Sequence, residues 1–340
     1  MALLLLKLTE RWGKRLKALV TGGTGFIGSH LISYLLNKKA RVKILVRKPD
    51  IAQKLFGKKV QLIQGDILDR PSLREAVNDV DVVFHLAAAL GATPISHKEF
   101  FRVNAQGTEN ILKVCRKSGI SRFVYCSTVA VSGDIKNPPA NEEAPYNPDE
   151  IYEKSKCRGE EIALKFAKIG LPVVVARPTW VYGPRDTRTL KLFRAIRRRR
   201  FIIAGKGTNL QHPVYVKDVA QGLYLCAQRD ILKGEVFILG GNEFITVGQL
   251  INKIASLLGV ELPSVKLPLW TLRPFGWIMG WSGKLLGFEP PLSPSKIAFF
   301  AKNRAYDISK AKRELGYRPK VNLERGLRQT LGWYIQNGYL

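Results

Sequence analysis

Short apolar runs alternate with longer amphipathic stretches through the first half of the chain. The apolar runs have the length of buried strands, and they are Leu16–Val20, Arg41–Val46, Val60–Ile63, Val80–His85, Arg122–Cys126 and Pro172–Ala176. Between them, helical spacing of apolar residues is found over Phe26–Leu36, Pro71–Val77, Glu99–Cys115 and Ile151–Ala167. Because strand–helix–strand units close with a right-handed crossover, the pattern predicts an α/β fold with a doubly wound parallel sheet covered by helices on both faces.

The pattern changes after residue 186. The predicted elements there are a basic helix over Thr187–Arg198, an extended piece to Val216, a strand over Glu235–Leu239, a helix over Val247–Leu258 and a helical tail around Leu315 within Ser309–Gly332. We therefore predict a sheet domain of residues 16–186, to which residues 213–245 return, and a smaller C-terminal lobe of residues 187–212 and 246–340. Residues 1–15 form an N-terminal extension, interpreted either as a disordered leader or as a short surface helix.

A glycine-rich turn lies between the first predicted strand and helix. It reads Thr21-Gly22-Gly23-Thr24-Gly25-Phe26-Ile27-Gly28. Glycines at this place let the backbone approach a pyrophosphate closely, and the unpaired N–H groups of the helix start point at the negative charge. The turn predicts a dinucleotide cofactor held by Gly22, Gly25, Phe26, Ile27 and Gly28.

Other predicted strand ends offer further cofactor contacts. Arg47 follows the second strand, where an acidic residue would bind the ribose hydroxyls of NAD and an arginine can hold a 2′-phosphate. The sequence therefore favours NADP(H), with NAD(H) as the alternative if Arg47 belongs to a solvated basic turn. Asp66 and Ile67 follow the third strand and are predicted to bracket the adenine. After the fourth strand, small residues would let the cofactor cross the sheet, namely Leu86, Ala87 and Ala88.

Tyr152 and Lys156 are four residues apart on a predicted helix, so both face one side. A phenol is a poor base at neutral pH, since its reference pKa is about 10. A neighbouring ammonium is expected to lower that pKa and make proton exchange with an alcohol or ketone feasible. Ser127 and Thr128 follow the fifth strand, and either hydroxyl could orient the substrate oxygen beside Tyr152. The structural alternative for Tyr152 and Lys156 is an exposed helix face, and for Ser127 and Thr128 it is a hydroxyl that caps the strand end.

Together these motifs resemble the extended short-chain dehydrogenases/reductases of the NAD-dependent epimerase/dehydratase group. The matching residues are Thr21–Gly28, Gly65-Asp66, His85–Ala88, Val103-Asn104, Gly107-Thr108, Ser127-Thr128, Tyr152–Lys156, Arg177-Pro178, Tyr182–Pro184, Val214–Ala220, Asp307 and Ala311–Gly316. The resemblance implies a Rossmann fold, Tyr152 as acid/base, Lys156 as its partner and Thr128 or Ser127 as the substrate-orienting hydroxyl. It also implies that Asn104 supports the core and that Pro178 lies at the cofactor.

The chain departs from the nucleotide-sugar members of this family in two places. Their arginine before the position of Val214 is replaced by Asn209–His212, and their Arg-Arg-x-Gly-Asp-like element by Lys302–Tyr306. Residues 266–300 are instead rich in aromatic and aliphatic side chains, similar to the branch of 3β-hydroxysteroid dehydrogenase-like, dihydroflavonol reductase-like and hopanoid-associated enzymes. A hydrophobic alcohol or ketone is the expected substrate. The alternatives are plain packing of these residues in the lobe, a nucleotide-sugar 4-epimerase or dehydratase with bound NAD, and a non-catalytic dinucleotide-binding scaffold.

The composition adds a formal net charge of +28, which favours anionic partners. The run Thr187–Arg200, with residues 267–288, suggests peripheral contact with an anionic membrane; no nucleic-acid motif accompanies the charge, so no nucleic-acid partner is expected. The histidines and four cysteines lack metal-ligand spacing, so no metal site and a cytoplasmic protein with free thiols are predicted. By family analogy, a homodimer would form through Glu99–Cys115 and Ile151–Ala167.

Overall fold

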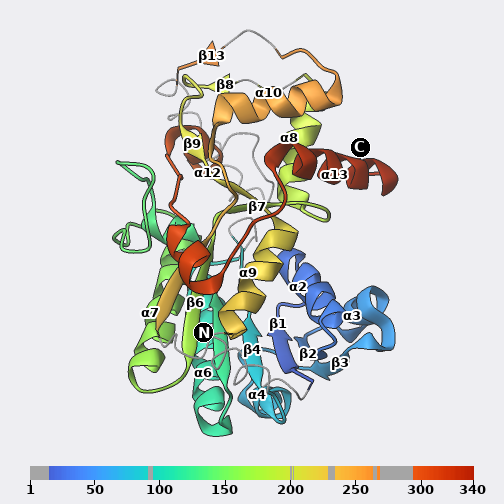
Figure 1. The fold of residues 1–340 in the computed structure, drawn as a ribbon, viewed down its shortest axis with the longest axis vertical. Coiled ribbons are helices and arrows are strands. Elements are labelled where there is room, and N and C mark those ends of the chain that lie inside the picture. The colour runs from blue at the N-terminus through green and yellow to red at the C-terminus, as the bar shows by residue number, and fades with distance from the viewer. Residues whose placement is uncertain are drawn as a thin grey trace.

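A seven-stranded parallel sheet organises the molecule in the computed structural model (Figure 1). The structure describes residues 15–90, 95–199, 201, 203–228, 234–262, 266–268 and 294–340. The sheet order is β11-β6-β5-β4-β1-β2-β3, and every neighbouring pair is parallel. Its strands are β1 (Lys17–Thr21), β2 (Arg41–Val46), β3 (Gln61–Gln64), β4 (Val82–His85), β5 (Arg122–Cys126), β6 (Val173–Pro178) and β11 (Glu235–Leu239). The strand order reverses between β1 and β4, which is the switch point where ligands bind in such sheets.

Alternate residues of each strand pack into two cores, one on each face of the sheet. Ala18 and Val20 of β1 face one core, and Leu19 faces the other. The first core is covered by α2 (Phe26–Asn37), α3 (Pro49–Phe56) and α9 (Val216–Gln228). The second is covered by α4 (Arg70–Val77), α6 (Gly107–Ser118) and α7 (Ile151–Lys168). This three-layer arrangement is visible in Figure 1 and confirms the predicted fold class.

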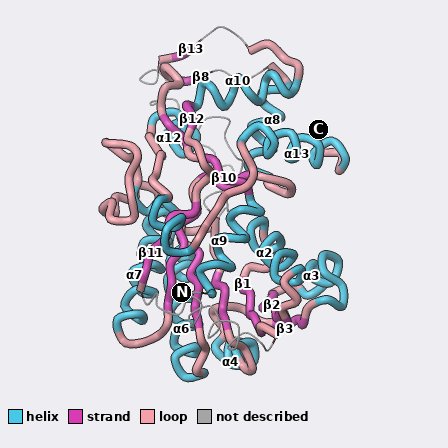
Figure 2. The backbone as a smooth tube through the Cα atoms, viewed as in Figure 1, coloured by secondary structure: helices cyan, strands magenta, loops and turns pink. Residues whose placement is uncertain are grey.

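A smaller lobe lies beyond the carboxyl ends of the strands and has its own core. Its helices are α8 (Thr187–Arg197), α10 (Val247–Leu258), α12 (Pro294–Ala301) and α13 (Leu323–Gln336). Its short strands are β7 (Trp180–Tyr182), β8 (Ile203–Ala204), β9 (Leu210–Gln211), β10 (Pro213–Tyr215), β12 (Ile245–Thr246) and β13 (Lys266–Leu267), joined in pairs as Figure 2 shows in magenta. A capping box of Thr246 and Gln249 starts α10, and left-handed Gly259 ends it.

Three sequence predictions of helices need correction. The predicted helix Glu99–Cys115 is divided into α5 (His97–Phe101), a π-helical turn η2 (Arg102–Gln106) and α6, because the Asn104 side chain bonds the backbone of Ala89 instead of facing outward. The predicted tail is divided into a π-turn η4 (Ala311–Leu315) and α13. Helices α3, α9 and α12 were not predicted at all. The short 3₁₀ turns η1 (Gly57–Lys59) and η3 (Val129–Ser132) complete the described elements.

Two stretches that the sequence singled out lie outside the described residues. They are residues 1–14 and, apart from Leu267 and Pro268, the aromatic segment 267–288. In the part of the chain that the structure covers, no helix is long and apolar enough to cross a membrane. All four cysteines are buried and unpaired.

Candidate active site

The glycine turn connects β1 to α2 and closes against the end of β4. Gly22 has a positive φ of 70°, and a Cβ there would lie 2.7 Å from the amide nitrogen of Ala87. A Cβ on Gly28 would lie 2.2 Å from the carbonyl oxygen of Gly22, so α2 can approach the turn only with glycine at this place. Gly25 caps α2 without a side-chain hydrogen bond, which leaves first-turn N–H groups of the helix for an anion.

The residues predicted to contact a cofactor follow the carboxyl ends of the neighbouring strands. Arg47 is exposed directly after β2, beside the glycine turn. Leu86, Ala87 and Ala88 are partly exposed after β4, whereas Pro178 is buried as the last residue of β6. This edge of the sheet therefore presents small side chains and backbone at the place where a dinucleotide would cross.

Asp66 and Ile67 differ in their surroundings after β3. Asp66 is partly exposed, and its Oδ1 accepts a hydrogen bond from the amide of Leu68 at 2.9 Å. The Ile67 side chain is buried beneath α6, where it meets the position a Cβ on Gly107 would take. Of these two residues, only Asp66 therefore offers a side chain to a ligand after β3.

Lys156 is buried in α7 with its ammonium held against the end of β5. Its Nζ donates a hydrogen bond to the carbonyl of Cys126 at 2.8 Å and lies 4.3 Å from the centre of the Tyr125 ring. Burial lowers the pKa of Lys156 from its ordinary 10.5 to about 8, so the group is mostly charged at neutral pH. A Glu150–Glu153 capping box fixes the start of this helix and so positions Tyr152, its second residue.

The pKa of Tyr152 shifts in the direction opposite to the one expected from the sequence. We expected the neighbouring ammonium to lower it, but burial is the largest influence and raises the pKa above its ordinary 10. Arg188 of α8 is the largest opposing influence. In the protein alone, the phenol is thus protonated at neutral pH.

Ser127 and Thr128, which the sequence left as alternatives, have different partners. Ser127 is buried and its hydroxyl donates to the Glu160 carboxylate. Thr128 is partly exposed, and its Oγ1 accepts a hydrogen bond from the amide of Ala130 at 3.2 Å. The Thr128 hydroxyl can still donate its own proton outward, so Thr128 is the better candidate for orienting a substrate oxygen.

Glu160 holds Ser127 within a buried ionic network that sequence reasoning did not find. Arg177 of β6 contacts Glu160 through two nitrogens, with its Nη2 2.6 Å from Oε1, and Tyr146 donates to the same oxygen at 2.8 Å. Both charged side chains are almost fully buried. Because Glu160 lies one helical turn after Lys156, the network locks α7 to β5 and β6 beneath the candidate catalytic residues. Its only sequence signal was the position of Arg177 at a strand end.

A second buried chain links the glycine turn to α7. The Ala87 amide donates to Thr21 Oγ1, which lies 2.8 Å from His85 Nδ1; His85 Nε2 lies 3.1 Å from Thr108 Oγ1. Thr108 donates to the carbonyl of Asn104, and Asn104 Nδ2 donates to Ser155 Oγ at 2.9 Å. Burial lowers the pKa of His85 to about 3, so the ring is neutral. Thr108 donates its hydroxyl proton to the Asn104 carbonyl, so it can only accept a hydrogen bond from His85. The proton of the neutral His85 ring therefore lies on Nε2.

Comparison with known proteins assigns this arrangement to a family. A model of the NAD-dependent epimerase/dehydratase family matches residues 18–240. The chain belongs to the NAD-dependent epimerase/dehydratase family. Its members are enzymes of the extended short-chain dehydrogenase/reductase type that act on small molecules, and so is this chain. The glycine turn fits the dinucleotide that the family uses, since Gly22 and Gly28 let α2 and the end of β4 pack closely against the turn and Gly25 leaves first-turn N–H groups of α2 without a side-chain cap.

Family relatives and structures extend over nearly the whole chain. An Arabidopsis thaliana 3β-hydroxysteroid-dehydrogenase/decarboxylase, isoform 2, is 30% identical over 359 residues, which cover 95% of this chain but 62% of that protein. A putative dihydroflavonol 4-reductase of Synechocystis sp. is 30% identical over 332 residues, covering 94% of this chain and 95% of that one. The crystal structure of a double mutant of DesIV, a dTDP-glucose 4,6-dehydratase from Streptomyces venezuelae with NAD bound, has a TM-score of 0.77 at 26% identity and covers 95% of this chain and 98% of its own.

Proposed function

We propose that the protein is an oxidoreductase that interconverts a secondary alcohol and a ketone on a hydrophobic substrate, with a preference for NADP(H). The observation that carries the proposal is the anchored Lys156 ammonium on the helix that presents Tyr152 at the carboxyl edge of the sheet. Thr128 leaves β5 at the same edge.

The pKa shifts of Tyr152 and Lys156 indicate which of the two groups carries a transferable proton and which a charge. The nicotinamide ring supplies or accepts the hydride when it is bound. During reduction, the protonated Tyr152 phenol donates its proton to the substrate oxygen, and Thr128 donates a hydrogen bond that fixes that oxygen. The charged Lys156 ammonium stabilises the phenolate that remains. Because burial keeps the phenol protonated in the protein alone, alcohol oxidation would first require Tyr152 to lose its proton.

An aromatic cluster in the smaller lobe supports a hydrophobic substrate. The centres of the Trp180 and Phe299 rings are 6.3 Å apart. Phe299 also packs against Phe300, which packs against Phe201. All four side chains are only partly buried. Trp180 comes two residues after Pro178, so the cluster begins next to the candidate cofactor edge. Relatives named as a hydroxysteroid dehydrogenase and a dihydroflavonol reductase agree with a substrate of this kind.

A nucleotide-sugar epimerase or dehydratase is the second candidate, because structural neighbours include such enzymes. The polar side chains of this lobe argue against it. Asn209 Nδ2 donates to the carbonyls of Phe299 and Lys302, and Gln211 Nε2 bonds the same two carbonyls. The Arg304 guanidinium pairs with Glu153 at 2.7 Å. The amide nitrogens of Asn209 and Gln211 and one guanidinium nitrogen of Arg304 are thus engaged within the chain, which leaves few donors of this set for a diphosphate.

Replacing Tyr152 by phenylalanine tests the proposal, because it removes the proton donor and keeps the ring. Turnover of ketone substrates from a panel of sterols, isoprenoids and flavonoids should fall by a factor of about 10² or more. The Kd for the reduced cofactor, measured by its fluorescence, should change little. Undiminished turnover in Tyr152→Phe would contradict the mechanism. Epimerised UDP-sugar without net cofactor turnover would instead favour the second candidate.

The cofactor preference is tested at Arg47. Arg47→Asp should weaken NADPH binding and strengthen NADH binding, because a carboxylate repels the 2′-phosphate and can accept from ribose hydroxyls. Calorimetric Kd values for both reduced nucleotides check this, with Lys54→Asp of α3 as a control of equal charge change. Equal NADPH and NADH affinities in the unaltered protein would remove Arg47 from the phosphate role.

A further inference from the structure

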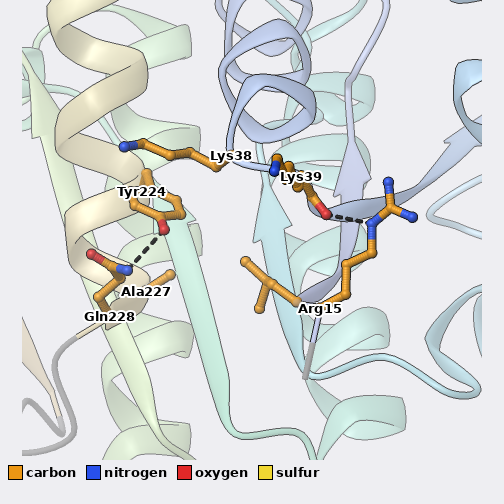
Figure 3. A pocket seen from close by; sticks show the side chains of 7 residues that line it. Arg15, Lys38, Lys39, Tyr224, Ala227 and Gln228 are labelled. Atoms are coloured by element: carbon orange, nitrogen blue, oxygen red, sulfur yellow. Dashed lines mark hydrogen bonds between the residues drawn. The ribbon is translucent and has the colours of Figure 1, made fainter. Parts of the chain in front are cut away.

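Basic side chains crowd the edge of the sheet opposite to the candidate active site. Two neighbouring depressions open at the amino-terminal ends of β1 and β2, with volumes of about 570 Å³ and about 380 Å³. Arg15 lines both of them. Figure 3 shows the larger one, where Tyr224 and Gln228 of α9 lie on one side and Arg15 and Lys39 on the other, with the Arg15 side chain bonded to the Lys39 carbonyl and the Lys38 side chain reaching toward Tyr224. We call this edge, with both depressions, the amino face.

The positive charge of the amino face is nearly uncompensated. The larger depression is lined by three basic residues and no acidic one. The smaller adds five more, among them Arg41, Lys58 and Lys59, and one acid, Asp79, which pairs with Lys17. Residues 1–14, which lead into Arg15, contain three basic residues and one acidic residue, so their own charge cannot neutralise the face. This charge favours an external anionic partner.

Exposed apolar side chains adjoin this charge. Ile51 and Leu55 are one helical turn apart on α3 and have exposed fractions of 48% and 36%. Helix α3 leads directly into η1, which carries Lys58 and Lys59. Apolar side chains beside lysines and arginines match the boundary between acyl chains and anionic headgroups, whereas nucleic-acid phosphates need only the charge.

We propose that the amino face docks on an anionic lipid surface. In this orientation the carboxyl edge of the sheet and the smaller lobe point away from the bilayer, so the cofactor can exchange freely with water. The basic run of α8, which the sequence suggested for lipid contact, is less suited. Arg194 of that run donates two hydrogen bonds to the Tyr339 carbonyl instead.

Vesicle binding by two charge-reversal variants tests the docking surface. The first carries Arg41→Glu, Lys58→Glu and Lys59→Glu on the amino face, and the matched control carries Arg197→Glu, Arg198→Glu and Arg199→Glu at and just after the C-terminal end of α8. All six side chains are exposed, and the two variants have the same net charge. Sedimentation with vesicles of equimolar phosphatidylcholine and phosphatidylglycerol should show partitioning about a hundredfold weaker for the first variant, given the usual gain per basic residue at such a surface. The control should partition like the unaltered protein.

Three results would overturn the proposal. The first is equal partitioning of the amino-face variant and the unaltered protein. The second is binding of the unaltered protein to pure phosphatidylcholine vesicles as strongly as to the mixed vesicles. The third is displacement from the mixed vesicles by duplex DNA at equal phosphate concentration, which would assign the face to nucleic acid. Circular dichroism and thermal unfolding of both variants establish that loss of binding is not loss of folding.

Discussion

Ser127 and Thr128 are adjacent hydroxyls with separate tasks. Thr128→Ala should lower kcat about a hundredfold, because it removes the proposed donor to the substrate oxygen. Ser127→Ala should leave kcat within a few-fold and lower the free energy of unfolding by about 1 kcal/mol, since Glu160 loses one of its buried donors. Steady-state kinetics and urea unfolding of both variants check this. Thr128→Ser, which keeps a hydroxyl, should restore most of the rate; a larger kcat loss in Ser127→Ala than in Thr128→Ala would reverse the assignment.

The sequence located the candidate residues but not their environments. The spacing of Tyr152 and Lys156 and the glycine turn are local features, so a single sequence reveals them. Ser127 bonds Glu160 of α7, which in turn is held by Arg177 of β6 and by Tyr146, all far away along the chain. Burial depends on the whole fold, and therefore the direction of the Tyr152 pKa shift could not be predicted.

Helix α7 carries both Tyr152 and Lys156, and Gly159 allows it to lie close to the sheet. A Cβ on Gly159 would lie 2.4 Å from the Asn104 carbonyl oxygen and equally close to the Tyr125 hydroxyl. Gly159→Ala should therefore displace α7, lower the free energy of unfolding by about 1–3 kcal/mol and reduce kcat. Thermal unfolding and kinetics measure both effects. Gly332→Ala of α13, where no atom lies within 4 Å, is the control and should be neutral or stabilising. A fully active and stable Gly159→Ala would contradict the close approach.

Elements with strong local patterns were predicted with accurate bounds. The bounds of β2, β5, β11 and α10 agree with the structure, because apolar runs and capping residues define them. The π-turn at Asn104 could not be predicted, since it depends on contacts with Ala89 and Ser155. Helix α3 is short and contains charged residues, and α9 follows β10 without an intervening turn. Both nevertheless have helically spaced apolar residues, such as Val216, Val219 and Leu223 of α9, which the sequence prediction missed.

The stability of the whole molecule should depend on pH through Lys156. Its pKa of about 8 in the folded protein is below the 10.5 of the unfolded chain, so the unfolded state binds more protons between these values. The free energy of unfolding should therefore increase by up to about 3 kcal/mol from this group as pH rises through that window. Urea unfolding of the unaltered protein and of Lys156→Met, at a series of pH values, isolates the contribution as the change in their difference. A difference independent of pH would contradict the buried ammonium.

The chain through His85 has a fixed polarity, and this restricts how Tyr152 recovers its proton. Every hydrogen from the Ala87 amide to the Asn104 carbonyl points the same way, and both ends are backbone groups that do not release protons. To conduct a proton, the hydroxyls of Thr21 and Thr108 and the imidazole of His85 would all have to reverse the direction of their hydrogen bonds. These hydrogen bonds therefore fix the glycine turn relative to α7, and they do not carry protons to the candidate site. A proton for each proposed catalytic cycle must therefore reach Tyr152 by a route other than this chain.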